Sequence, residues 1–437
     1  MLGAIGLIGG LVILTVLVMK GMNLLIAAPL SALFVGVLNG LPLFSQLATG
    51  EEVDFVTSYM DGFSGFVTSW YLMFLTGAIF GKVMEDSGAA ESVSHWIIKK
   101  IGMKRAVLAI VLACGVLTYG GVSLFVVAFA VYPMAVNLFK ESDFPRRFIP
   151  ATLALGSTTF TMTSAGSPEI QNWIPIPYLH TSPYAGWTVS IITALFMLVA
   201  GYLWLMHMIK KAKRKGEYFI SRAGDEVKDR KNLPNPFLSM IPLTIVLLVS
   251  FFLHETLEQS ALIIALTSGI IATWLLNKSY FRDFWKALGN GTEGALIALG
   301  NTSAVVGFGS VAKVTPAFNS AIDYVTHLPG SPLITGAFAV MVIAGLTGSS
   351  SGGQSIALPI LAPHYLDMGV NADAMHRTVS MSSGTLDSLP HGGYTVTTIR
   401  SIAGETHRDA YGAFGAMTVV VPLVAVVLAI GLFMLGL

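Results

Sequence analysis

Long apolar stretches alternate with short polar ones along the whole chain. A helix that crosses a lipid bilayer needs about 20 mostly apolar residues. The stretches that approach this length without interruption predict spanning helices at about 4–19, 22–38, 63–83, 187–209, 237–253, 261–276, 292–311 and 411–435.

Further apolar segments are interrupted by glycine, serine and proline. Segments 106–139 and 332–365 contain TYGGVS and TGSSSGGQS, and each is too long for one crossing and too short for two. We expect them to be re-entrant hairpins that turn near the middle of the membrane. Segments 148–180 and 378–400 contain TSAGSPE and LDSLPHGG, and we expect spanning helices with a break at these points.

The distribution of lysine and arginine predicts the topology, because cytoplasmic loops are the basic ones. Residues 21–81 contain neither lysine nor arginine, whereas basic residues gather at 82–105, 140–147 and 210–236. Interpreting the first interrupted segment as a hairpin places all three basic clusters on one side of the membrane. The predicted layout has about ten spanning segments, two hairpins and two external termini, with 210–236 as a cytoplasmic linker.

The two halves of the chain, 1–209 and 237–437, resemble each other at a displacement of about 228–230 residues. GKVMEDSGAAESVSHWI, from Gly81, aligns with GSVAKVTPAFNSAIDYV, from Gly309, and Arg147 aligns with Arg377. An odd number of crossings in each half gives the halves opposite orientations. Inverted repeats with broken helices are typical of secondary transporters. The sequence therefore predicts an all-α polytopic membrane protein with two inverted repeats.

Composition excludes several other classes of protein. Hydrophobic residues make up 54% of the 437 residues and charged residues 11%, against about 25% charged in soluble domains. The net charge is +1 and no basic cluster is interleaved with aromatics, which argues against nucleic acid as a partner. A single cysteine, Cys114, excludes an internal disulfide and a cysteine-rich metal site. No nucleotide-binding loop or hydrolase motif is present, so we expect no enzyme activity, no metal and no cofactor, and energy from an ion gradient.

Small and polar residues gather at the hairpin tips and helix breaks. Unpaired backbone N–H groups and the positive end of a helix dipole can face an anion at such points. We therefore expect a small organic anion to bind there. The candidate substrate-binding residues are Thr118, Gly120, Gly121, Ser123, Thr163, Ser164, Gly166, Ser349, Ser350, Ser351, Gly352, Gly353, Gln354, Ser383, Gly384 and Thr385.

Asp387 and His391 are the candidates for proton coupling. Ionisable groups at membrane depth are costly and mark ion paths or substrate sites. A spacing of four places both on one helical face, although Pro390 interrupts the helix between them. No basic residue stands near Asp387 in sequence, so desolvation favours its protonated form, as a proton carrier requires. Glu169, just after a Ser-Pro break, is open to interpretation as a cap or a gate residue.

Three stretches carry a resemblance to a known family: YGGVSLFVVAFAVYPMAVNLF from Tyr119, RRFIPATLALGSTTFTMTSAGSPEIQNWIP from Arg146 and GLTGSSSGGQSIALPILAP from Gly345. They resemble the gluconate permease family of the ion transporter superfamily, most closely its permeases for short hydroxy acids such as 3-hydroxybutyrate. The resemblance implies proton-coupled carboxylate uptake across the bacterial inner membrane, a homodimeric scaffold and an elevator-type movement of the hairpin-bearing domains. Gluconate-type members carry an Asn-Asp pair about where Pro390 and His391 stand here, so a smaller acid than gluconate is favoured.

The sequence is also compatible with other functions. Serine, threonine and carbonyl groups at the tips can coordinate sodium, so sodium-coupled symport is an alternative, as is a gluconate or sugar-acid permease. A channel is disfavoured because channels more often form rings of subunits around a repeated pore motif. An intramembrane hydrolase with a serine and His391 would lack a recognisable motif.

Overall fold

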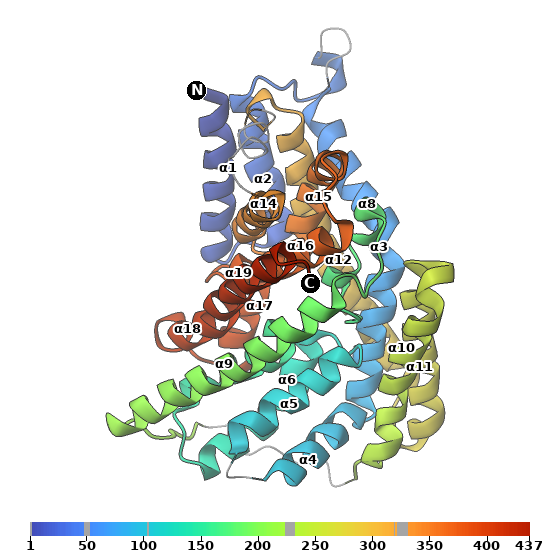
Figure 1. Ribbon diagram of the computed structural model, residues 1–437, viewed down its shortest axis with the longest axis vertical. Coiled ribbons are helices and arrows are strands. Elements are labelled where there is room, and N and C mark those ends of the chain that lie inside the picture. The colour runs from blue at the N-terminus through green and yellow to red at the C-terminus, as the bar shows by residue number, and fades with distance from the viewer. Residues whose placement is uncertain (1, 48–52, 103–104, 223–231, 319, 321–330) are drawn as a thin grey trace.

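The computed structural model describes residues 2–47, 53–102, 105–222, 232–318, 320 and 331–437, and within these it contains helices and no strand (Figure 1). The first half comprises α1 (Leu2–Met19), α2 (Leu24–Leu38), α3 (Phe55–Asp86), α4 (Ala89–Ile101), α5 (Ala106–Tyr119), α6 (Leu124–Glu141), α7 (Ile149–Ala154), α8 (Ile176–Leu179) and α9 (Trp187–Arg214). The second half comprises α10 (Pro236–Leu257), α11 (Ser260–Asn277), α12 (Phe284–Lys313), α14 (Pro332–Thr347), α15 (Ser350–Asp367), α16 (Ala372–Leu386), α17 (Gly393–Val396), α18 (His407–Gly415) and α19 (Val421–Met434).

The long helices α3 and α12 form the centre of the scaffold and run antiparallel. Small residues let them approach closely: a Cβ on Gly62 would lie 2.2 Å from Ser310 Oγ, and one on Gly291 would lie 2.7 Å from Ile79 Cα. The pair α1–α2 packs through α2 on α12, and the pair α10–α11 packs through α11 on α3. This arrangement gives each half of the chain an equivalent place in the scaffold.

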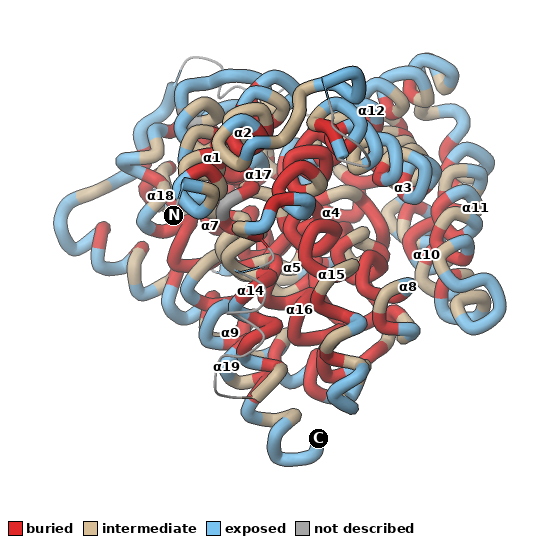
Figure 2. Tube along the Cα trace, turned by 90° about the horizontal axis from the view of Figure 1, so that it is seen from above, coloured by how far each residue is buried: buried red, intermediate tan, exposed pale blue. Residues whose placement is uncertain are grey.

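The structure agrees with the prediction that the chain spans a membrane. Seven of the described helices are long and apolar enough to cross a bilayer. Figure 2 shows exposed outward faces on α10 and α11 and buried backbone in the interior, around α5, α15 and α16. Large hydrophobic side chains lie on such outward faces, among them Leu195, Ile241 and Phe252. A surface of this kind suits lipid rather than water as its solvent.

Both predicted re-entrant hairpins are present as pairs of short helices. Helix α5 has 14 residues and is about 21 Å long, which is less than the roughly 30 Å of a bilayer core. It turns at Gly121, which has a φ of +94°, into α6. In the second hairpin, α14 ends at Thr347, the chain turns at Gly348, which has a φ of +64°, and α15 begins at Ser350. Glycine suits both turns because it adopts positive φ without strain.

The two predicted broken helices are also present, with shifted bounds. Helix α7 continues through a wide π turn, Leu155–Thr159, and then gives way to an irregular stretch. Helix α16 begins at Ala372, six residues before the predicted start, and breaks after Leu386. The chain resumes at α17 and continues as a π turn to Ile402.

The order of helices supports the internal repeat. Helices α3, α5, α6 and α7 recur as α12, α14, α15 and α16, and the first residues of α3 and α12 are 229 positions apart. Arg147 donates to the Asp409 carbonyl at the start of α18, and Arg377 donates to the Ala185 carbonyl just before α9. The aligned arginines therefore hold equivalent places. The aligned segment after α12 includes residues 319 and 321–325, which lie outside the described residues.

Loops predicted to share the cytoplasmic side lie at one end of the molecule. The buried Glu405 carboxylate pairs with Arg222 at 2.8 Å and with Arg146 at 3.5 Å. Glu217 pairs with Arg147 at 2.7 Å. The predicted linker begins inside α9 rather than after it, and its residues 223–231 lie outside the described part of the chain. The limits of the two repeats, and the assignment of this end to the cytoplasm, stay predictions.

Candidate functional site

The tip of the second hairpin lies against the break in the second broken helix. A Cβ on Gly348 would lie 3.1 Å from His391 Cδ2, and the Gly393 N–H donates to the Gly348 carbonyl over 3.4 Å. A hydrogen bond of 2.8 Å joins His391 Nε2 to the Gly345 carbonyl. His391 is therefore fixed to the hairpin tip rather than to Asp387.

Asp387 is the carboxylate beside this tip. Its Oδ1 accepts a hydrogen bond of 3.0 Å from Ser388 Oγ, and the Ser350 side chain lies within hydrogen-bonding range of the same carboxyl group. Among the described residues, no lysine or arginine forms an ion pair with it. Asp387 therefore stands at the first turn of α15 without a balancing positive side chain.

The start of α15 supplies the polar groups of the tip. Ser349 caps the helix by accepting a hydrogen bond of 3.1 Å from the Gly352 N–H, and its hydroxyl lies 3.3 Å from that of Ser351. Gly352 and Gly353 have packing roles. A Cβ on Gly352 would lie 3.1 Å from Val305 on α12, and a Cβ on Gly353 would lie 2.6 Å from the backbone of α14. The small residues of this tip thus serve both close approach and hydrogen bonding.

Gln354 joins the second hairpin to both broken helices. Its Nε2 donates to Ser383 Oγ at 2.6 Å and to the Gln171 carbonyl at 3.1 Å. The side-chain oxygens of Gln354 and Gln171 and the hydroxyl of Ser380 are buried without a hydrogen-bond partner. Buried polar atoms are normally bonded, so this cluster has capacity for a polar ligand or water. Gln171 is not among the predicted site residues, and its signal in the sequence is an amide side chain just past a helix break.

The first broken helix reaches α16 at two further candidates. A Cβ on Gly384 would lie 3.3 Å from Thr163 Cγ2. The fully buried Arg377 donates to the Thr163 carbonyl, to Asn172 Oδ1 at 2.9 Å and to the Ala185 carbonyl at 2.9 Å. In the sequence, Arg377 stands out only as the residue that aligns with Arg147 in the internal repeat. In the structure it fixes the first break by binding its free carbonyl groups.

The remaining candidates in the breaks make local bonds. Ser164 Oγ donates to the Phe160 carbonyl at 2.5 Å, and Thr385 Oγ1 donates to the Ser382 carbonyl at 2.6 Å. Gly166 has a φ of +77° and packs against the rings of Tyr184 and Tyr119. These contacts shape the breaks themselves.

The first hairpin tip has different surroundings from the second. A Cβ on Gly120 would lie 2.8 Å from Leu243, and one on Gly121 would lie 3.1 Å from Val246, both on the scaffold helix α10. The Thr118 hydroxyl is buried without a partner, and Ser123 makes no side-chain cap bond. The glycines at this tip therefore allow close helix packing and do not reach the polar cluster around Gln354.

Glu169 lies at the start of the second helix of this first hairpin. Its carboxyl group lies near the N–H of Leu124, the first residue of α6, and its Oε1 is buried without a partner. An acidic side chain is favourable at a helix N-terminus because of the helix dipole. Of the two interpretations of Glu169, the cap is the one that this contact supports.

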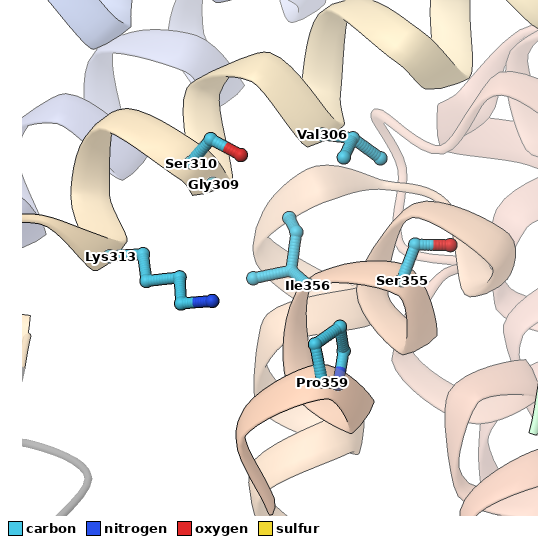
Figure 3. Close-up of a pocket in the computed structure, with 7 residues that line it drawn as sticks. All are labelled: Val306, Gly309, Ser310, Lys313, Ser355, Ile356 and Pro359. Atoms are coloured by element: carbon cyan, nitrogen blue, oxygen red, sulfur yellow. The ribbon is translucent and has the colours of Figure 1, made fainter. Parts of the chain in front are cut away.

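A small cavity lies between the scaffold helix α12 and the hairpin helix α15 (Figure 3). Its volume is about 70 Å³, and its lining includes Lys313 and Ser355. A second cavity of about 220 Å³ lies between α8 and the end of α10, beside His180 and His254. The described residues contain no group of three or more histidine, cysteine, aspartate or glutamate side chains that could hold a metal ion.

Comparison with known proteins identifies relatives of the chain. Residues 11–288 match the profile of the CitMHS family, described as citrate transporter. The chain is 37% identical to YxjC of Bacillus subtilis, described as an uncharacterized transporter, over 92% of each chain. It is 22% identical to a high-affinity gluconate transporter of Escherichia coli over 84% of each chain. The crystal structure of the Alcanivorax borkumensis YdaH transporter, which has an unusual topology, matches with a TM-score of 0.58 and 13% identity, over 97% of this chain and 99% of that one.

Proposed function

The chain belongs to the CitMHS citrate transporter family of membrane transporters, and on that premise we propose that it is a secondary active symporter for a small hydroxy monocarboxylate such as 3-hydroxybutyrate. We propose the proton as the coupling ion and the bacterial inner membrane as the location. Relatives named as transporters favour transport over hydrolysis.

The observation that supports this proposal is the meeting of the second hairpin tip with both broken helices. The start of α15 brings backbone N–H groups, Ser350 and Ser351 to the same place as the unpartnered oxygens of Gln354 and Gln171. Serine hydroxyls and the helix N-terminus suit a carboxylate group, and the amide oxygens can accept a hydrogen bond from a substrate hydroxyl. A short hydroxy acid carries both complementary groups.

Asp387 gives the proposed site its dependence on protons. A substrate carboxylate that reaches the first turn of α15 approaches Asp387, which already contacts Ser350. Two neighbouring carboxylates repel each other strongly inside a protein. Protonation of Asp387 removes this repulsion, so we propose that substrate and proton bind together. His391, fixed to Gly345, is the second titratable group of the same junction.

Sodium coupling is the alternative within transport, since hydroxyl and carbonyl oxygens of the same tip can coordinate a cation. Gluconate is the alternative substrate, because one relative bears that name. We also propose that the scaffold forms a homodimer, and that the hairpin-bearing part moves past α3 and α12 as an elevator.

Uptake into proteoliposomes tests the proposal. Labelled 3-hydroxybutyrate and gluconate are compared under an imposed pH gradient and under an imposed sodium gradient at equal pH. We expect 3-hydroxybutyrate to accumulate with the pH gradient alone. Accumulation with the sodium gradient alone would identify sodium as the coupling ion. If neither gradient drives carboxylate uptake, the proposed function is rejected.

A further inference from the structure

The cavity between α12 and α15 joins the scaffold to the hairpin that carries the proposed site (Figure 3). Helix α12 contributes Val306, Gly309, Ser310 and Lys313, and helix α15 contributes Ser355, Ile356 and Pro359. The two helices are very close here, because a Cβ on Gly309 would lie 2.4 Å from Ile356 Cγ1. Ser355 is five residues after Ser350, so the cavity lies roughly 7.5 Å along α15 from the hairpin tip.

Lys313 provides an uncompensated positive charge at this cavity. Its side chain is exposed and extends from α12 toward α15 (Figure 3), and none of the described residues forms an ion pair with it. By contrast, Lys82 in the corresponding part of α3 is held by Glu85 at 3.1 Å and Asp86 at 3.2 Å. The lysine of α12 therefore keeps its charge available for an anion.

The position of Lys313 along the chain makes its charge distinctive. In the predicted topology, the segments at the outer membrane surface contain only Lys313 and Arg377 as lysine or arginine residues. Arg377 is fully buried, so Lys313 is the exposed one of the two. An anion that approaches from outside therefore meets its strongest fixed attraction at this cavity. Clefts that carry one sign of charge raise the local concentration of an oppositely charged ligand.

Ser355 supplies a second, independent sign of a polar ligand. Its side chain is 7% exposed and its hydroxyl has no hydrogen-bond partner. A buried hydroxyl without a partner is unfavourable, and the neighbouring lining residues Ile356 and Pro359 offer no polar side chain. A carboxylate oxygen in the cavity would accept the hydrogen bond that Ser355 can donate.

We propose that this cavity is an external subsite that binds the carboxylate group of a small organic anion before the anion reaches the hairpin tip. Lys313 attracts the carboxylate, and the Ser355 hydroxyl donates a hydrogen bond to it. The volume of about 70 Å³ is several times what a single water molecule needs, so a carboxylate group can enter the cavity. The inference rests on the proposed function, because it gives that transporter an external binding step.

Kinetics with charge variants test the subsite. Lys313→Gln and Lys313→Glu are compared with the matched variants Lys286→Gln and Lys286→Glu, because Lys286 is exposed at the other end of the same helix. Uptake of labelled 3-hydroxybutyrate from outside is measured in oriented proteoliposomes at low and high salt. We expect Lys313→Gln to raise the external KM about two- to fivefold at low salt with an unchanged maximal rate, since exposed ion pairs are of modest strength. Salt should reduce the effect.

Cysteine labelling provides a readout that does not depend on transport. The single native cysteine, Cys114, is buried, so Val314→Cys places an accessible thiol directly beside Lys313 and keeps the lysine itself. A negatively charged, membrane-impermeant thiol reagent should label it from outside, and 3-hydroxybutyrate should slow the labelling more than a neutral diol of equal size.

The outcomes separate this inference from the proposed function. If wild-type protein accumulates carboxylate but Lys313→Glu leaves the external KM unchanged, or changes it no more than Lys286→Glu does, the subsite is rejected while the function stands. Equal protection by the carboxylate and the diol would also reject it. If wild-type protein transports no carboxylate, the proposed function itself is rejected.

Discussion

Replacing Asp387 by asparagine separates proton coupling from substrate binding. Asparagine has nearly the same shape and keeps an oxygen that can accept the 3.0 Å hydrogen bond from Ser388. It cannot ionise, so it resembles the protonated aspartic acid permanently. If Asp387 carries the proton, the variant should bind substrate at any pH and no longer respond to a pH gradient.

The size of each effect follows from the contacts. Exchanging a charged acceptor for a neutral one at Ser388 and Ser350 changes the interaction free energy by about 1 kcal/mol, which is about fivefold in affinity. The driving force is larger. One proton per monoanion under a gradient of about two pH units supplies about 2.7 kcal/mol, or about hundredfold accumulation. Loss of coupling is therefore easily distinguished from a modest change in affinity.

Two measurements in the same proteoliposomes examine this expectation. Net uptake under a pH gradient should fall from roughly hundredfold accumulation to equilibration in Asp387→Asn. Counterflow exchange of labelled for unlabelled substrate needs no net proton movement and should continue. Asp367→Asn, which removes an exposed carboxylate at the far end of α15, should behave as wild type. Continued accumulation by Asp387→Asn with the pH gradient alone would show that another group, His391 first, carries the proton.

Further expectations concern the two tips and the topology. Ser350→Ala should raise the KM about ten- to hundredfold through loss of a hydrogen bond to a charged group worth about 1.5–3 kcal/mol, and an unchanged KM would remove this tip from the site. Gly121→Leu should lower the thermal stability in detergent, because a Cβ there already lies 3.1 Å from Val246, and normal stability with a raised KM would contradict the packing role. Gly216→Cys should react only with reagents that reach the cytoplasm and Gly40→Cys only with external ones, and the opposite labelling would overturn the predicted orientation.

Much of the fold is predictable from local features of the sequence. The hairpins follow from apolar segments of unsuitable length with glycine and serine at their centres, and α5 and α14 are indeed too short to span a bilayer. The break after Leu386 follows from Pro390 and its glycine neighbours. Local composition controls these features, because chain reversal and helix interruption depend on the residues at the turn itself.

The contacts within the site were less predictable, because they join distant parts of the chain. Gln354 bonds the Gln171 carbonyl across 183 positions, and Arg377 reaches the Thr163 carbonyl across 214 positions. No local pattern around Gln171 or Arg377 indicates these partners. Their positions depend on how α15 and α16 pack against the first broken helix, which only tertiary structure determines.

The two hairpin tips differ in their packing, and this difference supports the proposed position of the substrate at the second tip. An anion needs unpaired donors and space, and the two halves of the repeat offer these unequally. At the first tip, Leu243 and Val246 fill the space beside the glycines, and Glu169 already occupies the start of α6. At the second tip, the start of α15 is lined by serines and adjoins buried oxygens without partners. At the first tip, a hydroxy acid would displace apolar packing and bring its carboxylate beside that of Glu169. At the second tip, its carboxylate could accept hydrogen bonds from the serine hydroxyls, and its hydroxyl could donate to the unpartnered amide oxygens of Gln354 and Gln171. The repeat supplies the shared hairpin architecture, and the divergence of its tips places the proposed anion site in the second half of the chain.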